Sequence, residues 1–211
     1  MERPRIFLVD DHALLVDAFR KLLEPEFEIA GTATDGKSLL ALAPEICPDL
    51  IMLDLGLPLL NGIDAGKRLK EMLPRTKLLI VTVNEDPLVA SEAMHQWASG
   101  YLLKKSAASE LVHAIRELLA GRTYITPKIA VHLEKEFLRK PLYQGQPELT
   151  FRQREVLQLL AEGHSMKETA HILDLTPRTV AFHKYRIMES FDLSTNLELL
   201  KLAVKEHLVA A

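Results

Sequence analysis

The sequence is poor in cysteine and in long apolar runs, and each shortage excludes a class of protein. The single cysteine, Cys47, excludes an intramolecular disulfide and an all-cysteine zinc site, and it fits a reducing compartment. The longest apolar runs span a few residues, far short of the roughly 20 that a membrane helix needs. The N-terminus leads directly into a strand-like segment, without the pattern of a signal peptide. We therefore expect a cytoplasmic protein that has no membrane partner.

The sequence also lacks the patterns of several enzyme classes. It has no Ser-His-Asp pattern, no phosphate-cradling glycine-rich loop and no His/Cys metal-ligand spacing, and its 8 histidines are scattered. The net charge of −3 is too small to indicate a partner. What remains is a chain of 211 residues, 48% hydrophobic and 26% charged, which is the composition of an ordinary globular protein. Its length predicts two compact units.

Short apolar runs alternate with helical patterns through the first part of the chain. The apolar runs predict strands at residues 6–9, 27–30, 50–53, 78–81 and 101–103. Helical spacing follows them at residues 13–23, 37–43, 63–72, 88–97 and 108–119. Nearly continuous apolar strands are typical of a parallel sheet that helices cover on both faces. The pattern therefore predicts an α/β domain with a doubly wound, five-stranded parallel sheet, which binds ligands at the carboxyl edge of its strands.

The last part of the chain, from about residue 149, has helical spacing throughout. Four residues of the kind that caps helix N-termini divide it into four predicted helices: Thr150, Ser165, Thr176 and Thr195. This pattern predicts an all-α, four-helix domain. Between the two domains, residues 127–138 have a helical pattern and residues 140–147 resemble a flexible tether.

Polar side chains follow the predicted strands where each strand ends. Asp10 and Asp11 follow the first strand and Asp54 the third, while Thr82 and Lys104 end the fourth and fifth. In one parallel sheet all of them would meet at the same edge. Clustered carboxylates repel one another, so they need a cation, and Mg²⁺ prefers oxygen ligands. A metal, an ammonium and a hydroxyl around one carboxylate would stabilise a transferring phosphoryl group, which makes Asp54 the predicted nucleophile.

Residues 4–121 resemble the receiver domain of two-component response regulators, which has a flavodoxin-like fold. The resemblance rests on Leu-Val-Asp-Asp at 8–11, on Leu-Asp-Leu-Gly-Leu-Pro at 53–58 with Asn-Gly at 61–62, on Val-Thr at 81–82 and on Gly-Tyr-Leu-Leu-Lys at 100–104. It implies that a sensor histidine kinase phosphorylates the protein. The implied site residues are the phosphoacceptor Asp54, the Mg²⁺ ligands Asp10 (through water), Asp11, Asp54 and the Gly56 carbonyl, the switch pair Thr82 and Tyr101, and Lys104 as the ion-pair partner of the phosphate.

Two positions depart from the pattern of the receiver family. Lys105 stands where an acid is common, and its ammonium would compete with that of Lys104, although the spacing from Tyr101 favours Lys104. Trp97 occupies a place where related sequences usually have glycine. Tryptophan does not readily adopt the left-handed backbone that glycine permits. We therefore expect a reshaped turn before the fifth strand, with an exposed indole ring that serves as a contact surface.

Residues 165–185 have the layout of a helix-turn-helix. The longer helix begins at Pro177, and its wheel places Val180 and Ile187 on the core face, while Phe182 and Tyr185 lie on the opposite face. Residues 175–188 contain no acid. Exposed rings beside basic residues suit the major groove of DNA better than they suit solvent.

Residues 148–211 resemble the LuxR-type DNA-binding domain, and the joining of such a domain to a receiver through a linker at 122–147 resembles the NarL/FixJ family. The matching segments include Arg-Glu-Val-Leu at 154–157, Ala-Glu-Gly at 161–163 and Arg-Thr-Val at 178–180. The resemblance implies a regulator that dimerises on activation, binds promoter DNA and acts on RNA polymerase. Its predicted DNA contacts are Lys167, Arg178, Thr179, Ala181, Phe182, Lys184, Tyr185 and Arg186.

Relatives often have polar residues at the positions of Ala181 and Tyr185. Here these positions offer apolar contact to thymine methyl groups and one phenolic hydroxyl rather than a charged fork to guanine, which predicts a T/A-rich half-site. Two alternatives remain at this stage. A phosphatase that uses Asp54 as its nucleophile would need a second acid two residues later, where Gly56 stands. An output domain that binds protein rather than DNA remains compatible with Phe182 and Tyr185.

Overall fold

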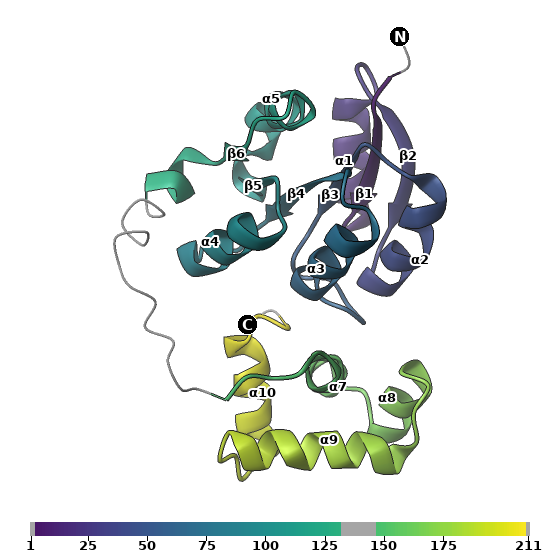
Figure 1. Ribbon diagram of the computed structural model, residues 1–211, viewed down its shortest axis with the longest axis vertical. Coiled ribbons are helices and arrows are strands. Elements are labelled where there is room, and N and C mark those ends of the chain that lie inside the picture. The colour runs from purple at the N-terminus through teal and green to yellow at the C-terminus, as the bar shows by residue number, and fades with distance from the viewer. Residues whose placement is uncertain (1–2, 132–146, 210–211) are drawn as a thin grey trace. The chain divides into compact units, whose positions relative to one another are not determined.

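The structure, a computed structural model, describes residues 3–131 and 147–209. The chain divides into two compact units, an N-terminal α/β unit and a C-terminal helical unit (Figure 1). The predicted linker helix is seen at residues 127–131, which are helical; its remainder, and residues 140–146 of the predicted tether, lie outside the described residues. Within the described ranges, every helix is too short or too polar to span a membrane.

The N-terminal unit is built on a parallel sheet in the order β2-β1-β3-β4-β5-β6. Its strands are β1 (Arg5–Val9), β2 (Glu28–Ala33), β3 (Leu50–Leu53), β4 (Lys77–Thr82), β5 (Gly100–Leu103) and β6 (Tyr124–Ile125). The central strands are buried along their whole length, because helices pack on both faces of the sheet. The predicted doubly wound fold is confirmed.

The sheet has one strand more than the sequence predicted. The additional strand, β6, pairs with β5 in the register Gly100↔Tyr124 and Tyr101↔Ile125. It falls within residues that we assigned to the linker. With only two residues, β6 is too short to show the alternation or the apolar run by which strands are recognised in a sequence.

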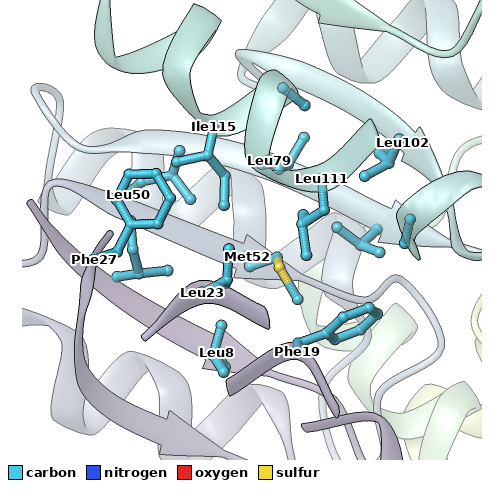
Figure 2. Close-up of a cluster of buried hydrophobic side chains, with 14 of the residues drawn as sticks. Leu8, Phe19, Leu23, Phe27, Leu50, Met52, Leu79, Leu102, Leu111 and Ile115 are labelled. Atoms are coloured by element: carbon cyan, nitrogen blue, oxygen red, sulfur yellow. The ribbon is translucent and has the colours of Figure 1, made fainter. Parts of the chain in front are cut away.

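Two helices, α1 (Ala13–Leu23) and α5 (Ala107–Leu119), share a hydrophobic core with one face of the sheet. Figure 2 shows this core, in which alternate strand residues such as Leu8, Met52 and Leu79 meet side chains of the two helices such as Phe19 and Leu111. Three further helices of the unit are α2 (Gly36–Ile46), α3 (Gly62–Met72) and α4 (Pro87–Gln96), and a short 3₁₀ turn, η1 (Lys104–Ser106), follows β5.

Over its described residues, 147–209, the C-terminal unit has four helices, as predicted: α7 (Phe151–Ala161), α8 (Met166–Ile172), α9 (Pro177–Ser190) and α10 (Asn196–Lys205). Each begins at one of the four predicted N-caps, whose side chain accepts a backbone N–H of the first turn. In three of them the Gln or Glu three residues later closes a capping box. A compact apolar core, which includes Leu157, Ile187 and Leu202, holds α7, α9 and α10 together.

Candidate functional site

Two of the predicted carboxylates lie buried at the carboxyl edge of the sheet. Asp10 directly follows β1 and Asp54 directly follows β3, and these strands are neighbours in parallel register, with Val9 opposite Leu53. Only 3% of Asp10 and 6% of Asp54 is exposed. Burial of a carboxylate costs free energy unless a cation or hydrogen bonds compensate for the lost water. The backbone N–H of Leu55 supplies one such bond to Asp54, at 2.7 Å.

The ammonium of Lys104 supplies the cation. Its Nζ lies 2.7 Å from Oδ2 of Asp10 and 2.8 Å from Oδ2 of Asp54. Burial alone would lower the pKa of Lys104, but the hydrogen bonds and charges of the two carboxylates outweigh it and raise the pKa above its usual value. The lysine is therefore charged at neutral pH.

Further ligand atoms surround the two buried acids. Carboxylate oxygens of Asp10, Asp11 and Asp54 and a ring nitrogen of His12 all lie within 4.8 Å of one another. Gly56 adjoins the group, since a Cβ built on it would lie 3.8 Å from Oδ2 of Asp54. A set dominated by carboxylate oxygens matches the donor preference of a hard divalent cation such as Mg²⁺.

The sequence places His12 beside the acid pair, where its side chain could tune the pocket, and favours a helix-capping role for it. The residue stands at the N-cap of α1, but its side chain makes no capping hydrogen bond. Its Nδ1 lies 2.7 Å from Oδ1 of Asp11 and 3.1 Å from Oδ1 of Asp10 instead. The position of His12 directly after the acid pair was the only signal in the sequence.

The predicted switch pair lies on β4 and β5. Thr82 ends β4 and is buried opposite Leu103, which directly precedes Lys104. The ring of Tyr101 is fully buried, and its hydroxyl donates a hydrogen bond to the carbonyl oxygen of Asn84 at 2.9 Å. The backbone N–H of Asn84 in turn bonds Oγ1 of Thr82 at 3.2 Å. Asn84, which sequence reasoning missed, therefore connects the two.

Burial raises the pKa of Tyr101, and the carboxylates of Asp86 and Asp54 add to the shift. The phenol therefore stays protonated and able to donate its hydrogen bond throughout the physiological range.

The neighbouring ammonium, that of Lys105, points to a different partner. It forms an ion pair with Glu85, as does Lys128. These hydrogen bonds lower the pKa of Glu85 to about 2, with the one from Lys105 contributing most. The sequence offered Lys104 and Lys105 as competing ion-pair partners of the phosphate, and Lys104 is the one that lies beside Asp54.

The prediction that the ring of Trp97 is exposed is wrong. Only 4% of the residue is exposed. The ring packs on α3, where a Cβ built on Gly66 would lie 2.3–2.6 Å from it. The backbone of Trp97 has a φ of −149°, so the turn before β5 does not use the left-handed conformation. The glycine on α3 leaves the room that the indole needs, and the spacing of residues along the chain does not reveal such a pairing.

In the helical unit, α8 and α9 form the predicted helix-turn-helix. The turn is tight because Asp174 adopts a left-handed φ of 53°. The inner side of α9 contributes Val180 and Ile187, both fully buried, to the core of the unit. Its outer side exposes Arg178, Phe182 and Tyr185.

The predicted DNA contacts all lie on α8 or α9. Lys167 is exposed in the first turn of α8, and Arg178 and Arg186 are exposed on α9. The other five are partly or largely exposed along α9: Thr179, Ala181, Phe182, Lys184 and Tyr185. Phe182 is 56% exposed and Tyr185 63%. The helix therefore presents both rings and several cations on accessible surface.

Comparisons with known proteins match both units. The profile of the response regulator receiver domain matches residues 6–116, and that of the bacterial regulatory proteins of the luxR family matches residues 147–203. The response regulator GacA of Pseudomonas aeruginosa is 32% identical, over 98% of this chain and 98% of its own length. The oxygen regulatory protein NreC of Staphylococcus carnosus is 31% identical, over 97% of this chain and 99% of its own.

Solved structures agree with the sequence matches. A structure of the response regulator RcsB of Salmonella typhimurium aligns with a TM-score of 0.65 at 25% identity, covering 97% of this chain and 98% of that one. A two-component response regulator of the LuxR family from Aurantimonas is 34% identical with a TM-score of 0.62, over 65% of this chain and all of that one.

The fold and these matches together define a response regulator whose receiver is joined to a helix-turn-helix domain. The chain belongs to the NarL/FixJ family of two-component response regulators, which carry a LuxR-type DNA-binding domain. Members of this family are DNA-binding transcription regulators rather than enzymes.

Proposed function

We propose that Asp54 accepts a phosphoryl group from a sensor histidine kinase, and that this modification controls binding of promoter DNA by α9. The position of the Lys104 ammonium between the buried carboxylates of Asp10 and Asp54 carries the proposal. In the transfer, an oxygen of Asp54 forms a bond to phosphorus while the bond from phosphorus to the nitrogen of the phosphohistidine breaks. Lys104 then pairs with a phosphoryl oxygen and offsets part of the added negative charge.

Mg²⁺ fits the donor set at this edge. Asp11, Asp54 and the carbonyl of Gly56 would hold it directly, and Asp10 through a water molecule. When bound, the ion supplies positive charge that neutralises the phosphoryl oxygens. The cluster holds the three carboxylates of Asp10, Asp11 and Asp54, and Lys104 compensates for the negative charge of one of them. This excess of negative charge supports the assignment.

Thr82 and Tyr101 act as the switch in this proposal. The Thr82 hydroxyl donates to a phosphoryl oxygen and gives up its bond to the backbone N–H of Asn84. The Asn84 carbonyl also accepts a hydrogen bond from the Tyr101 hydroxyl. The loop between β4 and α4 therefore responds to the phosphate through both hydrogen bonds of Asn84. A local electrostatic change is thereby converted into a rearrangement of one loop.

The output is a cytoplasmic homodimer on double-stranded DNA, which places two copies of α9 in half-sites about one helical turn apart. A solved complex of RcsB with DNA, 25% identical to this chain, supports DNA as the partner, and contact with RNA polymerase would follow at the promoter. Electrophoretic mobility shifts on random duplex DNA, with and without acetyl phosphate, test the proposal. A gain in affinity on phosphorylation supports it, whereas binding of no duplex in either state would favour the protein-binding alternative.

Replacement of Lys104 by Ala should weaken the coupling between phosphorylation and DNA binding. Hydrogen bonds to charged groups contribute about 1.5–3 kcal/mol, so we expect the phosphorylation-dependent gain in affinity to fall about tenfold or more. Lys105→Ala is the matched control, because that ammonium contacts Glu85 rather than Asp54. Titrations of both variants with acetyl phosphate would measure the difference. Equal responses of the two would contradict the role given to Lys104.

Lys184→Ala should reduce the salt dependence of DNA binding. If the ammonium contacts one phosphate, its loss lowers the slope of log K against log salt concentration by about one unit. Lys201→Ala, an equally drastic change at an exposed position of α10, serves as the control and should leave the slope unchanged. Fluorescence anisotropy over a range of salt concentrations gives both slopes. An unchanged slope for the Lys184 variant would remove this residue from the interface.

A further inference from the structure

We propose that α9 selects its DNA sites by apolar contact of Phe182 and Tyr185 with thymine methyl groups. The inference rests on the proposed binding of DNA by this helix and names the feature of the bases that the helix reads.

The first support is that neither ring is needed for the fold. The core of the unit takes Val180 and Ile187 from the opposite side of α9, and both are fully buried. Phe182 and Tyr185 are 56% and 63% exposed, although the surface of a soluble domain rarely gathers large apolar side chains without a partner. The exposure of the two rings therefore indicates that they contact a binding partner.

The second support is the spacing of the two rings. They are three residues apart, so they lie on the same side of the helix, about 4.5 Å apart along its axis. Successive bases of a DNA strand are about 3.4 Å apart. A helix lying in the major groove would thus present the rings to base pairs that are adjacent or nearly so. The outward side of Ala181 lies beside them and adds a methyl group.

The third support is the chemistry of the three neighbouring side chains at Ala181, Phe182 and Tyr185. Adenine is read by Asn or Gln, cytosine by Asp or Glu, and guanine by the forked donors of Arg or by Lys. Ala181 and Phe182 offer none of these groups, and Tyr185 adds one phenolic hydroxyl to its ring. The guanidinium of Arg178 lies on the same side but one turn earlier, away from the two rings. The methyl group of thymine is the one apolar feature that a standard base shows in the major groove, so it is the feature that these three side chains can distinguish.

A cationic side chain lies near each of the two rings. The guanidinium of Arg186 lies 5.7 Å from the centre of the Phe182 ring and also bonds the carboxylate of Glu189. The ammonium of Lys184 lies 6.0 Å from the centre of the Tyr185 ring. Both distances are within reach of a cation–π attraction. In the proposed complex, the DNA phosphates flank the base edges. Lys184 and Arg186 can therefore neutralise phosphates while the rings contact methyl groups.

Replacement of thymine by deoxyuridine tests the inference, because it removes the methyl group and leaves base pairing and phosphates intact. Sites would first be selected from a random duplex library with the full chain treated with acetyl phosphate. We expect T/A-rich half-sites, and we expect affinity to fall about fourfold for each contacted methyl that is removed. Phe182→Ala should abolish this preference for thymine over uracil at one position.

Two variants make the test specific. Tyr185→Phe retains the ring and should retain the preference, whereas Tyr185→Ala should lose it at a second position. Lys167→Ala, at an exposed position of α8, should weaken binding to thymine and uracil sites by the same factor. Selected half-sites without thymine, or equal affinity of the wild-type chain for both kinds of site, would overturn methyl recognition while leaving DNA binding intact. Failure to bind any duplex would overturn the proposed function together with this inference.

Discussion

Asp54→Asn should abolish the acid-labile phosphoryl adduct that acetyl phosphate or a sensor kinase forms on the wild-type chain. The variant should also lose the whole phosphorylation-dependent gain in DNA affinity. An amide oxygen is a far poorer nucleophile than a carboxylate, while the side chain keeps nearly the same shape. Lys104 retains its ion pair with Asp10, so we expect the receiver to remain folded.

Intact-protein mass spectrometry and DNA titration measure the two losses separately. Asp17→Asn is the matched control, because it makes the same chemical change at an exposed position of α1 away from the carboxylate cluster. This control should be phosphorylated and should respond as the wild type does. A phosphoryl adduct on the Asp54→Asn variant, or an undiminished DNA-binding response, would show that the switch does not operate through this residue.

Trp97→Ala should lower the free energy of unfolding by about 3–5 kcal/mol, the usual cost of deleting a large buried aromatic side chain. The indole fills the space above Gly66, a residue that has no side chain of its own. Its N–H is buried without a hydrogen-bond partner among the described residues, and such a group costs free energy. Trp97→Phe removes this N–H and keeps an aromatic ring, so its loss should be well below that of the alanine variant.

A double-mutant cycle isolates the contact between the ring and α3. Gly66→Ala places a methyl group within 2.3–2.6 Å of the indole, and overpacking of this kind costs about 1–3 kcal/mol. In a Trp97→Leu background the same methyl has room, so the cost should largely disappear. Urea unfolding followed by far-ultraviolet circular dichroism suits every variant, since Trp97 is the sole tryptophan. Additive effects of the two substitutions would contradict the proposed fit.

The carboxylate cluster could be predicted from the sequence because two strong local signals coincide there. Apolar runs identify the strands, and in a parallel sheet the residues after neighbouring strands must meet at one edge. Asp10, Asp54 and Lys104 therefore come together as expected. The four helices of the C-terminal unit were predictable for a similar reason, since each starts at a Ser or Thr whose capping role depends on residues close in the chain.

Other features depend on contacts between distant residues, which leave no periodic signal. The burial of Trp97 depends on a glycine 31 positions earlier, and β6 is held by its pairing with β5. Helix α2 was predicted to stop before Pro44, yet it continues to Ile46, and the left-handed φ of 48° at Cys47 ends it. The bond from Tyr101 to Asn84 likewise requires the folded loop. The family resemblance predicts that Tyr101 belongs to the switch pair, whereas only the folded structure shows that its hydrogen-bond partner is Asn84.

The additional strand has a mechanical consequence for how a signal leaves the receiver. The backbone N–H of Thr126 bonds the carbonyl oxygen of Tyr101 at 2.9 Å, and the Thr126 hydroxyl accepts the backbone N–H of Leu103 at 3.0 Å. Residues 124–126, where the segment between the two domains begins, are thus hydrogen-bonded to β5. This strand carries Tyr101 of the proposed switch pair and ends one residue before Lys104. A displacement of β5 would therefore move residues 124–126 with it.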